Sequence, residues 1–425
     1  RLAIYEKMLM SNGPNHRKQD VKTNSRMPTC NDNRELSLRI CLHTIWPIKT
    51  LFVGGTERFI IDTAKALKRY GFDVFVLCSN TTYQTEIEGV DVFGCIPRIY
   101  QNRLTGFENN PNKLIKEILY GEDSTINSIR SLNEFVRLQL QEYSFDIVHL
   151  NTFSASLFDD IPQNAILTIH ENPEELDTFW HDGAFAELAR FIQCGDLKLP
   201  RFTFAPSRHY AREYSKYFGQ EVFPNPIGVP WTNIGDIGSR KQKRGNRILL
   251  PARLFPQQKG QNILIEALGL LKSRGRSFNT TLTGADDRYI GEAKILQNRL
   301  NKLNLRSEVH IKQTNSIEVE FQNHDILVSP EQYCSYGISI REAAAMGLKL
   351  VLSNIPPHHE IEYGSLNIQY FEKNSITQCA DAIESAYLEP ETPIEKTLQF
   401  RLKSDFDEFA KRYAQHYLDL RAKSI

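Results

Sequence analysis

The sequence lacks a net charge, a long apolar run and an ordered set of cysteines. Lysine plus arginine and aspartate plus glutamate number 51 each among 425 residues, so the charge balance gives no reason to expect nucleic acid as a partner. No stretch reaches the roughly 18 apolar residues of a membrane-spanning helix. The seven cysteines have no short repeated spacing, which excludes a disulfide scaffold and indicates free thiols in a reducing cytoplasm.

Patterning along the chain predicts an arm followed by alternating strands and helices. The polar residues 1–35 predict a flexible N-terminal arm, with a partner-binding tail as the alternative. From Leu36 onward, short apolar runs alternate with patterns of helical period, as in parallel α/β folds. Strands are expected at 38–42, 73–77, 145–150, 165–169, 202–204, 247–250, 280–283, 309–311, 325–328 and 349–352. Helices are expected at 59–67, 177–194, after Ser207, and at 261–271, 293–303, 338–346, 376–387 and 394–420.

A stretch rich in proline and glycine, Phe223–Pro230, divides this alternation into two arrays. We therefore predict an N-terminal domain over residues 36–230, a linker over 231–245, a C-terminal domain over 246–395 and a C-terminal helix over 396–425. Each array is typical of a doubly wound, Rossmann-like domain. Ligands of such domains bind outside the carboxyl ends of the strands, so the site is expected in the cleft between the two domains.

Gly54 and Gly55 stand where the exit loop of an expected strand opens a helix. Glycine lets backbone N–H groups approach an anion, and a helix N-terminus favours negative charge, so the pair fits contact with a phosphate. The alternative is a tight turn in which Glu57 complements the helix dipole. The residues form neither G-x-G-x-x-G nor the Walker sequence, which makes an NAD-dependent dehydrogenase the least favoured enzyme class.

Four side chains and one glycine near strand ends are candidate ligand contacts. Arg253 and Lys259 suit a diphosphate, because arginine grips two oxygens and lysine adds a point charge. Glu342, expected at the start of a helix, suits the vicinal hydroxyls of a ribose, and Gly337 before it lets backbone donors approach a phosphate. His170 ends a strand and suits a substrate hydroxyl. The alternatives are solvated cations, a carboxylate that complements a helix dipole, and a structural histidine.

Four motifs occur together in a fixed order and spacing: Gly54-Gly55-x-Glu57, His170, Arg253-Leu-x-Pro-x-x-Lys259-Gly260, and Arg341-Glu342-Ala-x-Ala-x-Gly347 within residues 330–347. This set resembles the GT-B glycosyltransferases, and most closely the large retaining class called family four, or glycosyl transferases group 1. The resemblance implies two facing Rossmann-like domains with a cleft between them and a C-terminal helix that returns toward the N-terminal domain. The implied activity moves a sugar from a nucleotide-diphosphate sugar to a hydroxyl acceptor, with retention of anomeric configuration.

The resemblance also implies a role for each matching residue. The family's glycine loop falls on Gly54 and Gly55, near the donor, and its catalytic histidine falls on His170, near the donor sugar and the acceptor. Its phosphate-binding pair, the glycine before the following helix and the ribose-binding glutamate fall on Arg253, Lys259, Gly337 and Glu342. These cations and backbone donors are expected to neutralise the departing diphosphate while the acceptor attacks from the same face.

One position departs from the family's pattern. Two glutamates separated by seven residues are usual, and Cys334 stands where the first of them would contact hydroxyls of the donor sugar. A thiol is a weak donor and a weak acceptor. Three outcomes stay open: a different donor sugar, substitution by the nearby Glu331, or reduced activity. A further hypothesis gives the thiol a low pKa beside Lys259.

We expect neither a cofactor nor a bound metal. The pairs Asp159-Asp160 and Asp286-Asp287 and the scattered histidines and cysteines show no ligand spacing. The nucleotide-sugar is then a substrate, and nucleic acid is not expected as a partner.

The acceptor, a glycan or a lipid-linked sugar, is expected in the N-terminal domain. Arg98–Tyr120 interleaves basic and apolar residues, which predicts a peripheral contact with a membrane; the alternative is a surface helix with a solvated face. Other functions weighed against a glycosyltransferase are a sugar phosphorylase or nucleotide-sugar epimerase of related fold, and a non-catalytic subunit of this fold that binds nucleotide-sugar or partners an active enzyme.

Overall fold

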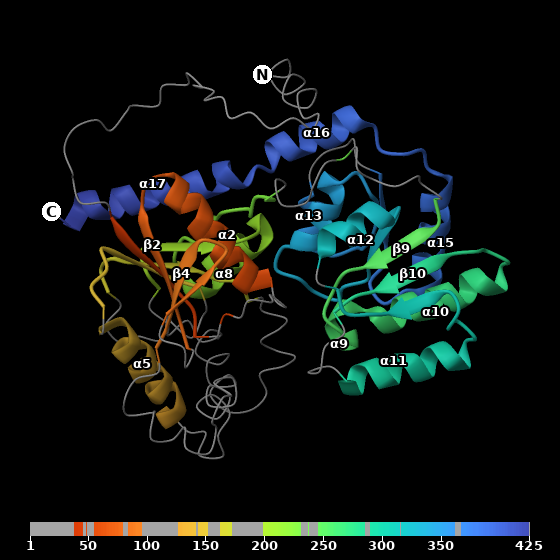
Figure 1. The fold of residues 1–425 in the computed structure, drawn as a ribbon, viewed down its shortest axis with the longest axis horizontal. Coiled ribbons are helices and arrows are strands. Elements are labelled where there is room, and N and C mark those ends of the chain that lie inside the picture. The colour runs from red at the N-terminus through yellow and green to blue at the C-terminus, as the bar shows by residue number, and fades with distance from the viewer. Residues whose placement is uncertain are drawn as a thin grey trace. The chain divides into compact units, whose positions relative to one another are not determined.

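The structure, a computed structural model, describes residues 38–45, 48, 55–79, 84–95, 126–141, 143–151, 162–171, 199–230, 237, 245–284, 290–314, 316–361 and 367–424. Several predicted features lie outside these residues: the arm 1–35, Gly54, the segment 98–120, the helix 177–194 and nearly all of the linker 231–245. Within the described part of the chain the strands form two sheets, one of eight strands and one of six (Figure 1).

The first sheet has the order β3-β4-β2-β1-β5-β6-β7-β8. Its pairs are parallel apart from the hairpin of β3 and β4. The strands are β1 Arg39–His43, β2 Asp73–Cys78, β3 Thr85–Ile87, β4 Val90–Gly94, β5 Ile147–Leu150, β6 Ala165–Thr168, β7 Phe202–Ala205 and β8 Phe223–Pro224. The five strands expected here are confirmed. The hairpin was not predicted, and the sheet extends one strand into the stretch interpreted as a break between arrays.

Helices cover both faces of this sheet. They are α2 Gly55–Arg69, α5 Ile126–Gln141, α8 Arg208–Phe218 and α17 Phe406–Ser424. Ile40 and Leu42 point into a core shared with α2 and α17, whereas Cys41 between them points into a smaller cluster that includes Leu140 of α5. The helix expected after Ser207 is confirmed as α8, and Ser207 caps it, since its side chain accepts a hydrogen bond from the Tyr210 N–H.

The second sheet is entirely parallel, with the order β11-β10-β9-β12-β13-β14. Its strands are β9 Arg247–Leu250, β10 Asn279–Leu282, β11 Val309–Ile311, β12 Ile326–Ser329, β13 Lys349–Ser353 and β14 Ile368–Phe371. Its helices are α9 Pro256–Lys259, α10 Gln261–Ser273, α11 Ile290–Lys302, α12 Ile317–Asn323, α13 Ile338–Ala345, α14 Pro356–His359, α15 Ile376–Leu388 and α16 Ile394–Lys403.

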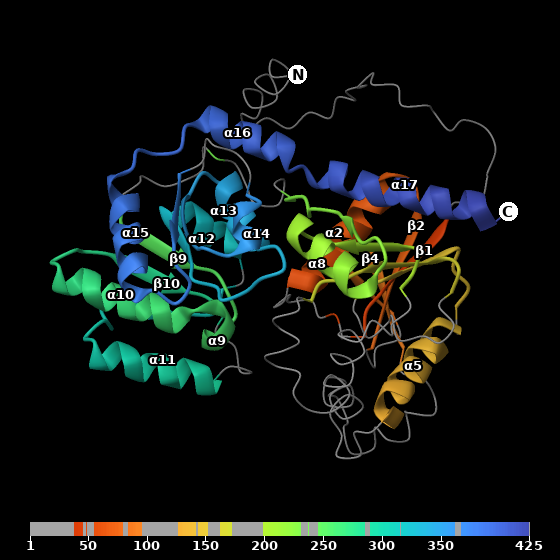
Figure 2. The ribbon, with the colours of Figure 1, turned by 180° about the vertical axis from the view of Figure 1, so that it is seen from behind.

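Alternate residues of these strands face opposite layers of helices. Ile248 and Leu250 pack with α10, α11 and α15, whereas Leu249 packs with α12, α13 and α16. The ribbons show the two layers on either side of β9 and β10 (Figures 1 and 2). Burial on both faces explains why these strands read as continuous apolar runs. None of the helices in the described residues combines the length and apolar character needed to cross a bilayer.

The prediction of a single C-terminal helix over 396–425 is wrong, because the chain forms two helices there, α16 and α17. Between them the Ser404 carbonyl accepts a hydrogen bond from the Val229 N–H at 2.6 Å, and Val229 and Asp405 form an isolated parallel bridge. This pairing uses backbone groups that would otherwise continue the hydrogen bonds of a helix. Serine and aspartate favour such an interruption, because their side chains compete for backbone hydrogen bonds. The chain then enters α17, which returns to the first sheet.

A buried polar chain fastens α17 to that sheet. His149 on β5 lies 2.6 Å from the Tyr417 hydroxyl through Nδ1 and 2.7 Å from Thr168 Oγ1 through Nε2. Thr168 in turn lies 2.7 Å from the Tyr413 hydroxyl. Burial lowers the pKa of His149 to about 3, so the ring is neutral at pH 7 and both nitrogens are used, one as donor and one as acceptor.

We expect Tyr417→Phe to lower the free energy of unfolding by about 1–3 kcal/mol, because it leaves a buried imidazole nitrogen without its partner. Urea titration at pH 7 measures the change. Tyr217→Phe, at a tyrosine that is 42% exposed on α8, is the matched control and should leave the midpoint unchanged. Equal midpoints for the two variants would show that the hydroxyl of Tyr417 contributes nothing to the attachment of α17.

Candidate active site

The segment between β12 and α13, residues 330–337, is the part of the chain that the predicted site residues approach. Gly260 passes so close to it that a Cβ would collide with the Pro330 carbonyl, and its φ of +67° favours glycine as well. The Gln332 N–H donates to the Gln258 carbonyl at 2.8 Å. The loop after β9 and the loop after β12 are therefore held together by backbone contacts.

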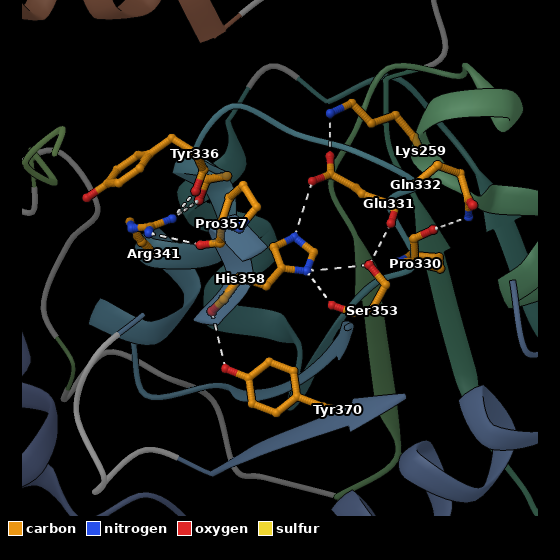
Figure 3. A network of polar contacts seen from close by, with 11 residues as sticks. Lys259, Pro330, Glu331, Gln332, Tyr336, Arg341, Ser353, Pro357, His358 and Tyr370 are labelled. Carbon is orange, nitrogen blue, oxygen red and sulfur yellow. Dashed lines mark hydrogen bonds and ion pairs between the residues drawn. The ribbon is translucent and has the colours of Figure 1, made fainter. Parts of the chain in front are cut away.

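Lys259, the last residue of α9, forms an ion pair with Glu331 at the end of β12 (Figure 3). The Glu331 side chain is 9% exposed. Although burial acts in the opposite direction, Lys259 and His358 bring the pKa of Glu331 down to about 2. Arg253 lies on the same loop as Lys259, where its guanidinium donates to Gln258 Oε1 at 2.8 Å. The predicted pair of cations thus belongs to one loop.

Glu331 also faces His358 on α14, a residue that none of the predicted motifs includes. His358 Nε2 and Glu331 Oε2 lie 3.5 Å apart, and neither atom has a hydrogen-bond partner. On its other side the imidazole is oriented by Ser353, whose carbonyl lies 2.8 Å from Nδ1 and whose hydroxyl donates to the Glu331 carbonyl at 2.6 Å (Figure 3).

Cys334 lies beside this pair and is buried. Burial raises its pKa well above the usual value of a thiol, the Glu331 carboxylate raises it further, and the smaller effect of Lys259 does not compensate. The hypothesis of a low pKa at Cys334 is therefore wrong, because the nearby ammonium is paired with Glu331. Within the described part of the chain, Glu331, Cys334 and His358 form one group whose ligand atoms lie within 4.8 Å of one another. The search for ligand spacing missed this group, since His358 is distant in sequence.

Glu342 is buried in the second turn of α13, not at its start as expected. Its Oε1 lies 3.1 Å from an Nη atom of Arg58 on α2. Burial raises the pKa of Glu342 to about 7, and Arg58 limits that rise. Arg58 was not selected from the sequence. Its position one helical turn after the glycine pair is the only sequence signal that would have indicated it.

His170 follows β6, and its imidazole is partly buried. Phe59 of α2 contacts it edge-to-face, with ring centroids 4.6 Å apart, and the Ser335 hydroxyl donates to the His170 carbonyl. Asn151 uses its amide nitrogen on the carbonyls of residues 43 and 149, so its oxygen faces His170 Nε2 at 3.3 Å. Burial lowers the pKa of His170 to about 3. The ring is a neutral imidazole whose Nε2 carries the hydrogen and whose Nδ1 keeps a lone pair.

The two predicted glycines that the structure describes lie at helix starts. Gly55 is the first residue of α2, and a Cβ there would lie 3.6 Å from Ile338 Cδ1, at the start of α13. Gly337 caps α13 with a φ of +74°, and the Arg341 guanidinium stacks on the Tyr336 ring beside it, 3.4 Å from the centroid. The structure thus brings His170 to Ser335 and Gly55 to Ile338, in the same stretch of chain that Lys259 contacts at Glu331.

Two family profiles match this sequence. The profile of glycosyl transferases group 1 matches residues 236–399, and the profile of glycosyltransferase family 4 matches residues 53–229. The chain belongs to glycosyltransferase family 4. This glycosyltransferase is accordingly an enzyme of the retaining class with the GT-B fold, which transfers a sugar from a nucleotide-sugar. The family that the motifs of the sequence resembled is confirmed.

Similar proteins agree with this assignment. Glycogen synthase of Mycobacterium tuberculosis is 24% identical to the glycosyltransferase over 403 residues, which cover 88% of this chain and 93% of that protein. Sucrose-phosphate synthase from Thermosynechococcus elongatus has a TM-score of 0.70 at 14% identity, over 91% of this chain and 100% of that chain.

Two similar structures contain nucleotides. The catalytic domain of starch synthase IV from Arabidopsis thaliana, bound to ADP and acarbose, has a TM-score of 0.60 at 14% identity over 91% of this chain and 100% of that chain. An Anabaena protein in complex with UDP and glucose has a TM-score of 0.56 at 16% identity over 91% and 98% of the two chains. Identities this low support the fold of the glycosyltransferase alone.

We expect Glu342→Gln to be more stable than the wild-type protein at pH 8 and no more stable at pH 4. A carboxyl with a folded pKa of about 7 against 4.5 in the unfolded chain contributes stability below pH 4.5 that is lost as pH rises through 7, in total about 3 kcal/mol. Urea unfolding at the two pH values measures the difference. The exposed Glu395→Gln on α16 is the control, with no such change. A wild-type advantage that stays constant between the two pH values would contradict a buried, protonated Glu342.

Proposed function

We propose that the glycosyltransferase moves a hexosyl group from a nucleoside-diphosphate hexose to a hydroxyl of a growing glycan. The observation that carries this proposal is that Lys259 from α9, His170 from the end of β6 and Arg58 from α2 all contact the segment 330–342, where Arg58 pairs with Glu342. Relatives whose names include glycogen synthase and sucrose-phosphate synthase support a hexosyl donor and a sugar acceptor. Structures of similar proteins with UDP and with ADP make these two nucleotides the first candidates.

In this proposal the diphosphate lies over the carboxyl ends of β9 and β12. Arg253 and Lys259 supply positive charge, and the backbone at Gly337 supplies N–H donors at the start of α13. The developing charge on the leaving diphosphate is stabilised in a setting that is already ordered, because the loop around Gly260 is held against Pro330. Lys259 binds Glu331 in the free protein, so the donor shares the ammonium with that carboxylate.

Glu342 is proposed to bind the ribose and Glu331 to bind a hydroxyl of the donor sugar in place of the missing first glutamate. Glu342 must lose its proton or its bond to Arg58 to accept hydrogen bonds from both ribose hydroxyls, and its raised pKa makes this step sensitive to pH near neutrality. Glu331 is ionised and lies three residues before Cys334, at the same end of β12. The buried thiol packs beneath it.

His170 is proposed to orient the reacting hydroxyls. As a neutral imidazole it offers the lone pair of Nδ1 to a sugar or acceptor hydroxyl, while Asn151 holds the other nitrogen. Its low pKa argues against a role as a cationic group. The acceptor hydroxyl then attacks the anomeric carbon on the face from which the diphosphate departs, and the leaving phosphate takes its proton.

Melting curves with a panel of nucleoside diphosphates and their sugars test the proposal. A ligand present at 100 times its dissociation constant stabilises the native state by about 2.7 kcal/mol, which is a visible shift. A shift with one base series, followed by transfer to an oligosaccharide, is the expected result. If every nucleotide leaves the melting temperature unchanged, the non-catalytic subunit becomes the better description of the site.

We expect Lys259→Ala to lower kcat for the donor so identified by about 100-fold, since it removes roughly 3 kcal/mol of stabilisation from the departing diphosphate. Steady-state rates of nucleoside diphosphate release measure the loss. Lys272→Ala is the control, because that lysine pairs with Glu308 on an exposed surface. Unchanged kcat in Lys259→Ala would remove this residue from the donor site.

A further inference from the structure

We propose that Glu331, Cys334 and His358 bind one divalent metal ion of the zinc class. The three side chains offer a carboxylate oxygen, a sulfur and an imidazole nitrogen, which is a ligand set that zinc accepts. They come from the loop after β12 and from α14, and all are buried. Nothing in this inference depends on which sugar or acceptor the enzyme uses.

The first argument is the separation of Glu331 Oε2 and His358 Nε2. These atoms lie 3.5 Å apart, and both are buried without a hydrogen-bond partner. Two ligands of a tetrahedral zinc ion, each bonded at about 2.1 Å, lie about 3.4 Å apart. The two atoms are thus already spaced as neighbouring ligands, and Cys334 Sγ lies within 4.8 Å of a ring nitrogen of His358 and of a carboxylate oxygen of Glu331.

The second argument is the orientation of His358. Its Nδ1 lies 2.8 Å from the Ser353 carbonyl, which can only accept, so Nδ1 carries the hydrogen (Figure 3). Nε2 is then the ring atom that faces the Glu331 carboxylate, where a metal ion bound by its lone pair would replace any proton that joins the two groups. A backbone carbonyl that holds the far nitrogen is also the usual support of a metal-bound histidine.

The third argument is charge. Lys259 pairs with Oε1 of Glu331, whereas His358 faces Oε2, so the ammonium and the metal ion use different oxygens of one carboxylate.

The bound ion would fix the loop 330–337 to α14 and leave the proposed role of Lys259 unchanged. Because Cys334 stands where family members usually carry a glutamate, the ion would anchor the loop at that position through Oε2 of Glu331, and Oε1 stays available to Lys259 and the donor hydroxyl. The metal ion would serve to hold the loop in one position and would not stabilise the charge that develops on the leaving diphosphate.

The test is titration of the metal-free, full-length protein with Co²⁺, followed by competition with Zn²⁺. We expect one equivalent of Co²⁺ to give the thiolate-to-cobalt charge-transfer band, and Zn²⁺ to displace it. Cys334→Ser should abolish the band, and His358→Gln should weaken binding at least tenfold, since even changes outside the ligand shell cost 10–100-fold.

Two controls match these variants. His359→Gln changes the exposed neighbour of His358, and Cys379→Ser changes a buried cysteine in the core of α15; both should bind Co²⁺ as the wild-type protein does. If Cys334→Ser does not fold, the chemical shift of cadmium bound to the wild-type protein reports whether one sulfur is a ligand. A wild-type protein without the band, a band that persists in Cys334→Ser, or cadmium bound without sulfur would overturn the proposal. Each readout is independent of transfer activity, so its failure is distinct from that of the proposed function.

Discussion

A carboxylate that is removed from water needs positively charged partners. The buried carboxylate of Glu331 therefore needs cationic side chains close to it in the second sheet. It lies at the end of β12 with little exposure, and Lys259 reaches it from the loop after β9. That reach depends on Gly260, where any side chain would collide with Pro330. The glycine, the lysine and the glutamate therefore form one unit that sets the distance between two strand ends.

Burial favours the neutral form of two other site residues, by lowering the pKa of one and raising the pKa of the other. It keeps the imidazole of His170 neutral and keeps a proton on Glu342 up to about pH 7. Both effects remove charge from a region that must receive an anionic donor. In the free protein Lys259 is paired with the Glu331 carboxylate, so a diphosphate that shares this ammonium meets a cation that is already held in place.

The sequence predicted the buried strands well, because burial on both faces leaves a continuous apolar run such as Ile248–Leu250. It missed the β3–β4 hairpin and β14, which lie at sheet edges and mix polar with apolar residues. In the site, residues that follow strands within recognisable motifs were found. Arg58 and His358 were not, since their partners are distant in sequence and only packing brings them together. The pKa of Cys334 was misjudged because the sequence does not show that Glu331 already occupies the ammonium of Lys259. The domain boundaries and the roles of the site residues stay predictions.

The return of α17 to the first sheet has a consequence for the order of events during synthesis. One face of β1 and β2 is covered by residues that include Phe409, Tyr413 and Tyr417, and these leave the ribosome only after the entire second sheet. The strands of the first sheet therefore emerge with one apolar face, and with the histidine that contacts Tyr417, still open to water. Until α17 has emerged, that face stays open to water, and the core of the first sheet is complete only when α17 packs on it.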